Sequence, residues 1–169
     1  MNKAVFLDRD GTINVDKAYL FKPEDFVWIK GAKEAIKYAH DKGYLVIIVT
    51  NQSGVARGYF GEEDVKALHK FINDELQKIN TKIDAFYYCP HHPEAVVEKY
   101  KVECNCRKPK SGMILQAAKD YNIDLSSSWI FGDNERDILA GKNAGVKGAI
   151  FNSEDDLYEF IKAKTSFYN

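Results

Sequence analysis

The stretch Phe6-Leu7-Asp8-Arg9-Asp10-Gly11-Thr12-Ile13-Asn14 decides the fold, because an apolar strand expected at residues 4–7 ends there on two acidic side chains. Side chains two positions apart in a strand point the same way, and Gly11 permits a sharp turn immediately afterwards. Two unpaired carboxylates this close repel each other, so we expect a cation or a shared proton between them. The pair marks the end of this strand as a place for chemistry, although Asp residues also occur in plain turns and helix caps.

Apolar strands alternate with amphipathic helical stretches along the rest of the chain. Strands are expected at residues 4–7, 44–49, 83–88, 129–131 and 148–151, and helices at residues 32–41, 62–79, 112–121, 137–143 and 155–164. Continuous apolar strands separated by helices predict an α/β fold with a doubly wound, mostly parallel, Rossmann-like sheet covered on both faces. With 169 residues, of which 45% are hydrophobic, we expect one domain over residues 1–169.

Composition and charge narrow the classes of partner. The chain carries 24 basic and 25 acidic residues, a formal net charge of -1, so no basic field favours nucleic acid. No apolar run approaches the roughly 18 to 20 residues that span a bilayer, and no signal peptide precedes the first strand. We therefore expect a cytoplasmic monomer that binds neither membrane nor nucleic acid.

Polar groups follow the other strands as well. In doubly wound sheets ligands bind beyond the carboxyl ends of the strands. Here the second strand is followed by Thr50-Asn51-Gln52-Ser53-Gly54, and the strand at 129–131 by Gly132-Asp133. A hydroxyl and backbone N–H groups over residues 50–54 form a cradle for phosphoryl oxygens. Taken singly, Thr50 is equally a structural strand cap and Asp133 a helix cap.

The segment Asp8 to Asn14 resembles the first motif of the haloacid dehalogenase superfamily phosphatases. The later motifs of that superfamily fall in order on Thr50, Lys108 and Asp133. The resemblance implies that Asp8 attacks a phosphoryl group to form an aspartyl phosphate, while Asp10 protonates the leaving oxygen and then activates water. Lys108 would neutralise the transferred charge, unless it is simply a solvated lysine.

The same resemblance implies a magnesium site. Its ligands would be the Asp8 side chain, the Asp10 backbone carbonyl and the Asp133 side chain, since Mg²⁺ prefers oxygen ligands. Asp137 is expected to support this loop rather than to bind the metal.

All three cysteines cluster near histidines, in Cys89-Pro90-His91-His92-Pro93 and Cys104-Asn105-Cys106. Four such ligands within eighteen positions predict a closed, tetrahedral, structural zinc site. Buried free thiols are the main alternative, and a disulfide is weaker because three cysteines are an odd number. Spacing permits either His91 or His92 as the ligand, and only the resemblance favours His91.

A zinc loop before Arg-Lys-Pro is similar to that of two branches of the superfamily, the heptose bisphosphate phosphatases and the histidinol-phosphate phosphatases. The resemblance to the first branch covers nearly the whole chain, including residues 8–19, 50–58, 87–93 and 104–109. It implies removal of the 7-phosphate of a heptose 1,7-bisphosphate in lipopolysaccharide precursor synthesis, with histidinol phosphate as the alternative substrate. No insertion is long enough for a separate cap domain.

A small phosphorylated sugar with two phosphates needs a second anion site. The available cations are Arg57, Arg107 and Lys110, and Arg107 is our choice for the distal phosphate or the sugar, unless it only packs against the loop. Lys108 would serve the transferred phosphate together with Thr50, Asn51, Gln52 and Ser53, and Asp16 and Tyr19 would meet sugar hydroxyls.

Two other classes remain open at this point. A phospho-acceptor signalling module also combines a doubly wound sheet, an Asp, magnesium, a Thr and a Lys. In such a module, however, the acceptor Asp follows the third strand, and nothing acidic follows Tyr88 here. The last alternative is a zinc-stabilised binding protein without catalysis.

Overall fold

The computed structural model describes residues 1–166, so the last three positions of the expected domain, 167–169, lie outside the described residues. Five parallel strands form one sheet: β1 (Lys3–Leu7), β2 (Tyr44–Asn51), β3 (Ala85–Cys89), β4 (Trp129–Gly132) and β5 (Lys147–Ile150). The helices are α1 (Ala32–Asp41), α2 (Glu62–Gln77), α3 (Gly112–Tyr121), α4 (Glu135–Ala144) and α5 (Leu157–Thr165), with short 3-10 turns η1 (Pro23–Asp25), η2 (Glu98–Tyr100) and η3 (Leu125–Ser127). The doubly wound parallel sheet predicted from the sequence is confirmed.

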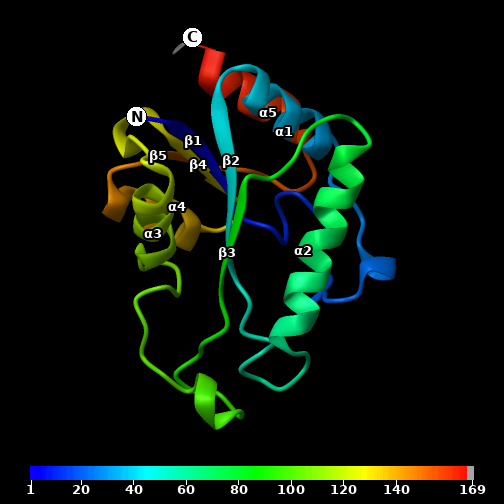
Figure 1. Ribbon diagram of the computed structural model, residues 1–169, viewed down its shortest axis with the longest axis vertical. Coiled ribbons are helices and arrows are strands. Elements are labelled where there is room, and N and C mark those ends of the chain that lie inside the picture. The colour runs from blue at the N-terminus through cyan, green and yellow to red at the C-terminus, as the bar shows by residue number, and fades with distance from the viewer. Residues whose placement is uncertain (167–169) are drawn as a thin grey trace.

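Helices cover both faces of this sheet (Figure 1). In β1, Val5 and Leu7 pack in the cluster that contains residues of α1, α2 and α5, whereas Ala4 and Phe6 pack in the cluster that contains residues of α3 and α4. Alternate side chains of one strand therefore enter two different cores. This explains why the strands are continuous apolar runs rather than alternating patterns.

The strand order is β3-β2-β1-β4-β5, which places β1 at the centre of the sheet. The chain winds outward from β1 in both directions, so the order reverses between β1 and β4. At such a reversal the loops beyond the carboxyl ends diverge and leave a crevice for ligands. The flavodoxin-like order 2-1-3-4-5 of receiver modules is different, which argues against the signalling alternative.

Two connections at the carboxyl ends of the strands are long. Residues 8–31 join β1 to α1, and residues 90–111 join β3 to α3. Within the described residues neither connection folds into a separate cap domain. The second, which we call the zinc loop, extends past the end of the sheet at the bottom of Figure 1. It is tied down by the N–H groups of Val96 and Val97, which both donate to Ala56 O at 3.0 Å.

Side-chain hydrogen bonds lie at the starts of α4 and β3, which both differ from the starts expected from the sequence. Helix α4 begins at Glu135, two residues before the expected start, because Asn134 and Asp137 form a capping box. Strand β3 begins at Ala85 rather than at residue 83. Just before it, the Asp84 carboxylate accepts the Val46 N–H at 2.8 Å.

Over residues 1–166, none of the helices has the length and apolar character that crossing a membrane requires.

Candidate active site

The acidic pair after β1 meets the acidic loop after β4. Carboxylate oxygens of Asp8, Asp133 and Asp137 all lie within 4.8 Å of one another. Burial raises the pKa of Asp8 to about 7, with the negative charges of Asp137 and Asp10 adding to the rise and Lys108 opposing it. The pKa of Asp133 is also raised, first by partial burial and then by Asp137. A cluster of carboxylates that resists ionisation in this way is suited to hold a cation.

Lys108 is the charged partner of this cluster and is 2% exposed. Its ammonium donates to Asp8 Oδ1 at 3.0 Å and to Val49 O at 2.7 Å, and it forms an ion pair with Asp137. Burial lowers the pKa of Lys108, but Asp8 and Asp137 outweigh burial and the net shift is upward. The solvated-lysine alternative is therefore wrong: the ammonium lies against the expected nucleophile.

Asp137 supports the loop, as expected from the sequence. Its Oδ2 accepts the N–H of Asn134 at 3.2 Å, and the residue is fully buried. It nevertheless lies in the carboxylate cluster, where it gives the Lys108 ammonium a second carboxylate partner beside Asp8.

Gly11 is required by close approach as well as by conformation. Its φ is +83°, and a Cβ atom there would lie 2.2 Å from Asp133 Oδ2. Any other residue would both strain the turn and displace the Asp133 carboxylate. The glycine of the opening motif therefore keeps Asp133 beside Asp8.

The Asp10 carboxylate points into the same cleft and is held from three sides. Asn14 Nδ2 donates to it at 2.9 Å, Gln52 Nε2 at 3.2 Å, and the Arg9 guanidinium at 3.2–3.3 Å. Gln52 also donates to Thr50 Oγ1 at 2.9 Å, so it joins the two expected catalytic groups. The sequence analysis assigned no role to Arg9, which is 1% exposed.

In the segment after β2, some polar groups are hydrogen-bonded within the protein and others remain free for a ligand. The Asn51 side chain is engaged with the Lys108 backbone, donating to its O at 3.2 Å and accepting from its N at 3.0 Å. The Gln52 N–H is also engaged, with Cys89 O at 2.8 Å. Across the described part of the chain, the N–H groups of Ser53 and Gly54 have no hydrogen-bond partner. Both groups remain available to a bound anion beside Thr50, where the sequence predicts a phosphate cradle.

A cleft of about 400 Å³ connects these groups. It is lined by all the expected phosphate and sugar residues except Lys108, which lies buried beneath it: Asp8, Asp10, Asp16, Tyr19, Thr50, Asn51, Gln52, Ser53 and Arg107, with Asp133. Tyr19 adopts a φ of 65°, and Asp16 Oδ1 accepts the N–H of the neighbouring Ala18 at 3.0 Å. A left-handed conformation is rare for an aromatic residue and supports a functional role for this turn.

Three arginines, Arg57, Arg107 and Arg136, also line the cleft. Among residues 1–166 none of the three forms an ion pair with a carboxylate. The pKa of Arg107 is lowered, first by burial and next by the positive charge of Arg136. Arg136 was not among the cations expected from the sequence. The expected cation Lys110 is instead directed at Cys104 O, at 2.7 Å, and does not line the cleft.

The cysteine and histidine ligands of the zinc loop converge on one point. His91 Nδ1 lies 3.5 Å from Cys89 Sγ and 3.3 Å from Cys106 Sγ, and Cys104 Sγ lies 3.5 Å from Cys89 Sγ. Ligands of tetrahedral zinc are separated by about 3.5–3.8 Å, given Zn–S bonds of about 2.3 Å. The Sγ atoms of Cys89 and Cys106 are in disulfide contact. A disulfide, however, uses two of the four groups and leaves Cys104 and His91 facing it without a role.

His92 lies outside this cluster. Its Nδ1 accepts the N–H of Glu94 at 3.0 Å, whereas the four-ligand group consists of Cys89, His91, Cys104 and Cys106. The geometry thus favours His91 over His92 as the ligand, a choice that the spacing alone left open.

Comparisons with known proteins identify the family of the chain. Residues 3–165 match the model of the polynucleotide kinase 3 phosphatase family. The D-glycero-beta-D-manno-heptose-1,7-bisphosphate 7-phosphatase of Haemophilus ducreyi is 50% identical over 146 residues, which cover 86% of this chain and 80% of that protein.

Solved structures of phosphatases superpose on this chain. A HAD-like phosphatase from Mesorhizobium loti superposes with a TM-score of 0.82 at 39% identity, over 87% of this chain and 71% of that one. The D,D-heptose 1,7-bisphosphate phosphatase of B. bronchiseptica, complexed with magnesium and phosphate, superposes with a TM-score of 0.80 at 31% identity, over 96% and 86%. The chain therefore belongs to the polynucleotide kinase 3 phosphatase family, within the haloacid dehalogenase-type phosphatases, and is a phosphoric monoester hydrolase.

Proposed function

We propose that this chain removes the 7-phosphate of D-glycero-D-manno-heptose 1,7-bisphosphate and retains the 1-phosphate. The observation that carries the proposal is the cleft itself, which is lined both by Asp8 and by three arginines, Arg57, Arg107 and Arg136. A substrate with two phosphates needs two anion sites, and arginine is suited to the phosphate that is not transferred. The names of the relatives favour heptose bisphosphate over histidinol phosphate.

The side chains in the cleft divide the chemistry between them. Asp8 is the nucleophile, and its carboxylate attacks the phosphorus atom while the bond to the sugar oxygen breaks. Asp10 donates a proton to that oxygen and then takes one from the water that hydrolyses the aspartyl phosphate. Lys108, Thr50 and the N–H groups after β2 stabilise the charge on the phosphoryl oxygens.

Magnesium fits the carboxylate cluster. The donor atoms are oxygens, they lie within 4.8 Å of one another, and burial and mutual repulsion raise the pKa of Asp8 and Asp133. Asp8, Asp133 and the Asp10 backbone carbonyl would hold the ion. When bound, it supplies positive charge that screens Asp8 from the anionic substrate.

Zinc fits the Cys89, His91, Cys104 and Cys106 cluster, because three thiolates and an imidazole are the donors of closed structural sites. Arg107 and Lys108 directly follow Cys106, so the ion would hold both cations at the cleft. Its role is structural, since four protein ligands leave no position for substrate.

The wider setting of the reaction is also part of the proposal. Residues 1–169 form one phosphatase domain that works as a cytoplasmic monomer, without membrane or nucleic acid. Its product enters the synthesis of nucleotide-activated heptose for lipopolysaccharide.

The test is a substrate panel assayed with magnesium and with EDTA. It contains both anomers of heptose 1,7-bisphosphate, histidinol phosphate and a generic aryl phosphate, and ³¹P NMR identifies which phosphate leaves. We expect one heptose anomer to have the highest kcat/KM, to lose only its 7-phosphate and to depend on magnesium. If neither anomer exceeds the aryl phosphate by tenfold, the substrate assignment fails.

A further inference from the structure

The buried Arg9 guanidinium connects Asp10 in the cleft to helix α2. Its Nε and Nη2 donate to the Asp10 carboxylate at 3.2–3.3 Å, and Nη2 also reaches Leu20 O at 3.0 Å and Gln52 Oε1 at 3.3 Å. Its Nη1 lies 3.3 Å from Nε2 of His69, a residue of α2. One planar group thus touches Asp10, the loop after β1, the segment after β2 and a helix.

The chemistry of this contact fixes the state of His69. Arginine has only donors, so Nε2 of His69 must be the acceptor and the imidazole must be neutral. Burial, and then the charge of Arg9, lower the pKa of His69 to about 3, which agrees with the neutral form. The ring is 5% exposed and stacks on Phe86 with 4.3 Å between centroids.

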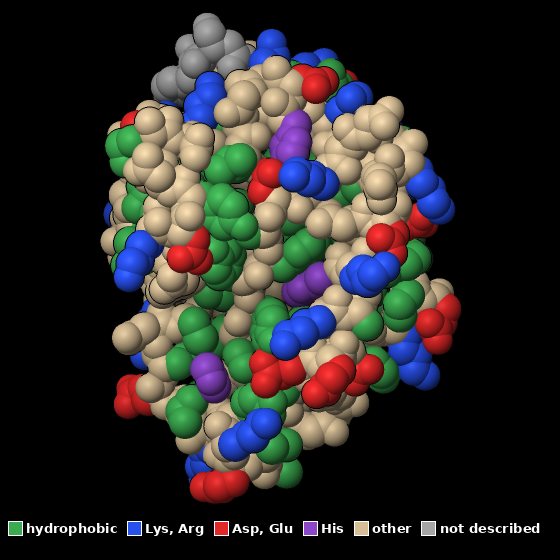
Figure 2. Space-filling model, in the orientation of Figure 1, with side chains coloured by type: hydrophobic (Ala, Val, Ile, Leu, Met, Phe, Trp, Pro, Cys, Tyr) green, Lys and Arg blue, Asp and Glu red, His purple; other side chains and the backbone are tan. Residues whose placement is uncertain are grey.

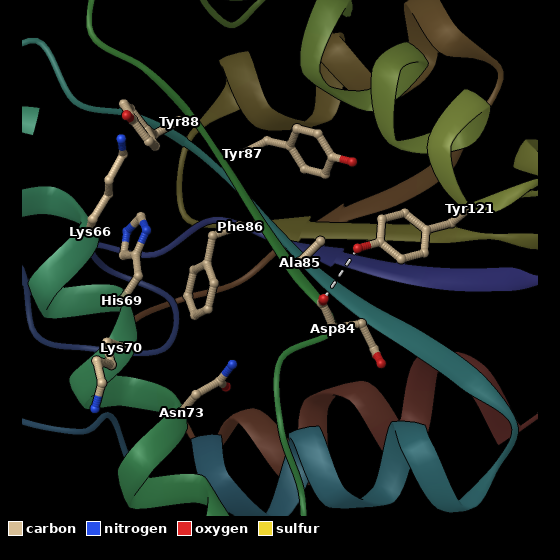
Figure 3. A pocket seen from close by; sticks show the side chains of 10 residues that line it. All are labelled: Lys66, His69, Lys70, Asn73, Asp84, Ala85, Phe86, Tyr87, Tyr88 and Tyr121. Atoms are coloured by element: carbon tan, nitrogen blue, oxygen red, sulfur yellow. Dashed lines mark hydrogen bonds between the residues drawn. The ribbon is translucent and has the colours of Figure 1, made fainter.

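His69 cannot easily turn away from Arg9. Figure 3 looks into a second pocket, lined mainly by residues of α2 and β3 and separate from the active-site cleft. It shows His69 projecting from α2 toward Phe86 of β3, with Lys66 and Lys70 leaving the same helix. In the view of Figure 2, hydrophobic side chains line the middle of this face between α2 and α3. The acceptor presented to Arg9 is therefore held by packing against the edge strand.

We propose that Arg9 and His69 are positioning residues that hold the Asp10 carboxylate in the orientation needed for proton transfer. The inference rests on the proposed function, because it assumes that Asp10 is the acid and base. His69 fixes the guanidinium through Nη1, and the guanidinium fixes Asp10 through Nε and Nη2. Neither residue lines the cleft, so both act through Asp10 rather than on the substrate.

The experiment compares His69→Phe with His69→Gln in the full-length protein. Phe keeps the stacking on Phe86 but offers Arg9 no acceptor, whereas Gln supplies an amide oxygen. Two substrates separate proton transfer from nucleophilic attack. Heptose bisphosphate has an alkoxide leaving group that needs a proton, and 2,4-dinitrophenyl phosphate has a leaving group that needs none.

For His69→Phe we expect kcat on heptose bisphosphate to fall at least tenfold with KM within twofold. The pre-steady-state burst of dinitrophenolate, which reports attack by Asp8, should stay within twofold of the wild type. His69→Gln should recover kcat to within threefold. Arg9→Lys, which keeps the charge but cannot reach Asp10 and His69 together, should repeat the pattern of His69→Phe and serves if that variant does not fold.

Two results would overturn the inference alone: an active wild type whose His69→Phe and Arg9→Lys variants keep full kcat, or variants whose burst and turnover fall to the same extent. The second result would indicate a general structural role. A wild-type chain with neither burst nor turnover would overturn the proposed function and this inference with it.

Discussion

At the scale of single residues, the Asp8 carboxylate lies beside the Lys108 ammonium and close to the carboxylates of Asp133 and Asp137. Lys108 pairs with both Asp8 and Asp137, so removing the Asp8 charge leaves the ammonium with one carboxylate partner. Because Asp137 still pairs with Lys108, a neutral residue at position 8 does not leave the ammonium as an unpaired buried charge, which would cost several kcal/mol. Substitutions at Asp8 can therefore report on chemistry rather than on folding.

Asp8→Asn should lower kcat by at least about 10³-fold, because an amide cannot form the acyl phosphate. Its thermal midpoint should not fall, since one of three mutually repelling carboxylates is removed. Steady-state kinetics and thermal denaturation measure the two effects. Turnover within tenfold of the wild type would exclude Asp8 as the nucleophile.

Gly11→Ala should weaken the binding of magnesium. Backbone strain costs about 1–2 kcal/mol at a left-handed position, and the new Cβ also displaces Asp133. Gly145→Ala is the matched control, because Gly145 has the same φ of +83° but nothing within 4 Å of its Cβ position.

Both variants should lose similar stability in urea denaturation. Only Gly11→Ala should need at least tenfold more Mg²⁺ for half-maximal activity. Identical magnesium titrations of the two variants would contradict the role assigned to Gly11.

The residues that sequence reasoning missed share a physical cause. Arg9 reads as a solvated charge between two acids, yet it is buried because its acceptors come from Asp10, Leu20, Gln52 and His69. Those partners are set by packing of distant segments, which no local pattern contains. The motif residues themselves, such as Asp8 and Lys108, were singled out because their motifs resemble, in order, those of a known phosphatase superfamily.

At the scale of elements, the zinc loop is the segment with the least core of its own. Buried hydrophobic contacts from residues 90–111 are few, and the loop depends on the cysteine and histidine cluster and on Glu62, which accepts from both Tyr88 and Tyr100 at 2.7 Å. Such a segment is expected to loosen when its metal is removed.

His91→Ala should lose the zinc and lower kcat at least tenfold, since Arg107 and Lys108 are no longer held. His92→Ala, one residue further and outside the cluster, should keep about one zinc per chain and nearly full activity. Metal analysis by mass spectrometry and kinetics check both. A His91→Ala protein with full zinc and full activity would remove the zinc-loop proposal.

The boundaries of elements were less predictable than their existence. The start of α4 was encoded in Asn134 and Asp137, a capping box that precedes the first periodic apolar residue. The start of β3 was not encoded locally, because Asp84 takes its partners from β2 and from His40 of α1. Hydrophobic periodicity predicts that an element exists, and tertiary hydrogen bonds decide where it ends.

At the scale of the whole molecule, the neutral buried His69 makes stability depend on pH. Its pKa is about 3 when folded and about 6.5 when unfolded, so below pH 6.5 only the unfolded chain binds the proton. The free energy of unfolding should therefore fall as the pH drops from 6.5 toward 3, by about 2 kcal/mol at pH 5.

His69→Gln is the reference for this effect, because it lacks the titrating group and keeps an acceptor for Arg9. Urea denaturation at pH 7 and pH 5 should give a larger loss for the wild type than for this variant. Equal losses would show that His69 is protonated in the folded state. Contributions of other groups, such as Asp8, cancel in the comparison.

The architecture as a whole was predictable because continuous apolar strands between helices allow few topologies. The order β3-β2-β1-β4-β5 was not read from the sequence, and it decides which strand ends become neighbours. The sequence predicted that Asp8 and Asp133 share a rim, whereas the cleft with Arg57, Arg107 and Arg136 required the placement of two loops and of the first turn of α4.

The central place of β1 also has a consequence for synthesis on the ribosome. β1 is made first, but one of its two neighbours is β4, and the Asp8 and Lys108 ion pair joins residues 100 positions apart. A nascent chain that has emerged only through β3 still lacks Lys108 and Asp133. With the roles proposed for Lys108 and Asp133, we expect catalysis to begin only after most of the polypeptide has left the exit tunnel, and truncated products of interrupted translation to be inert toward the substrate.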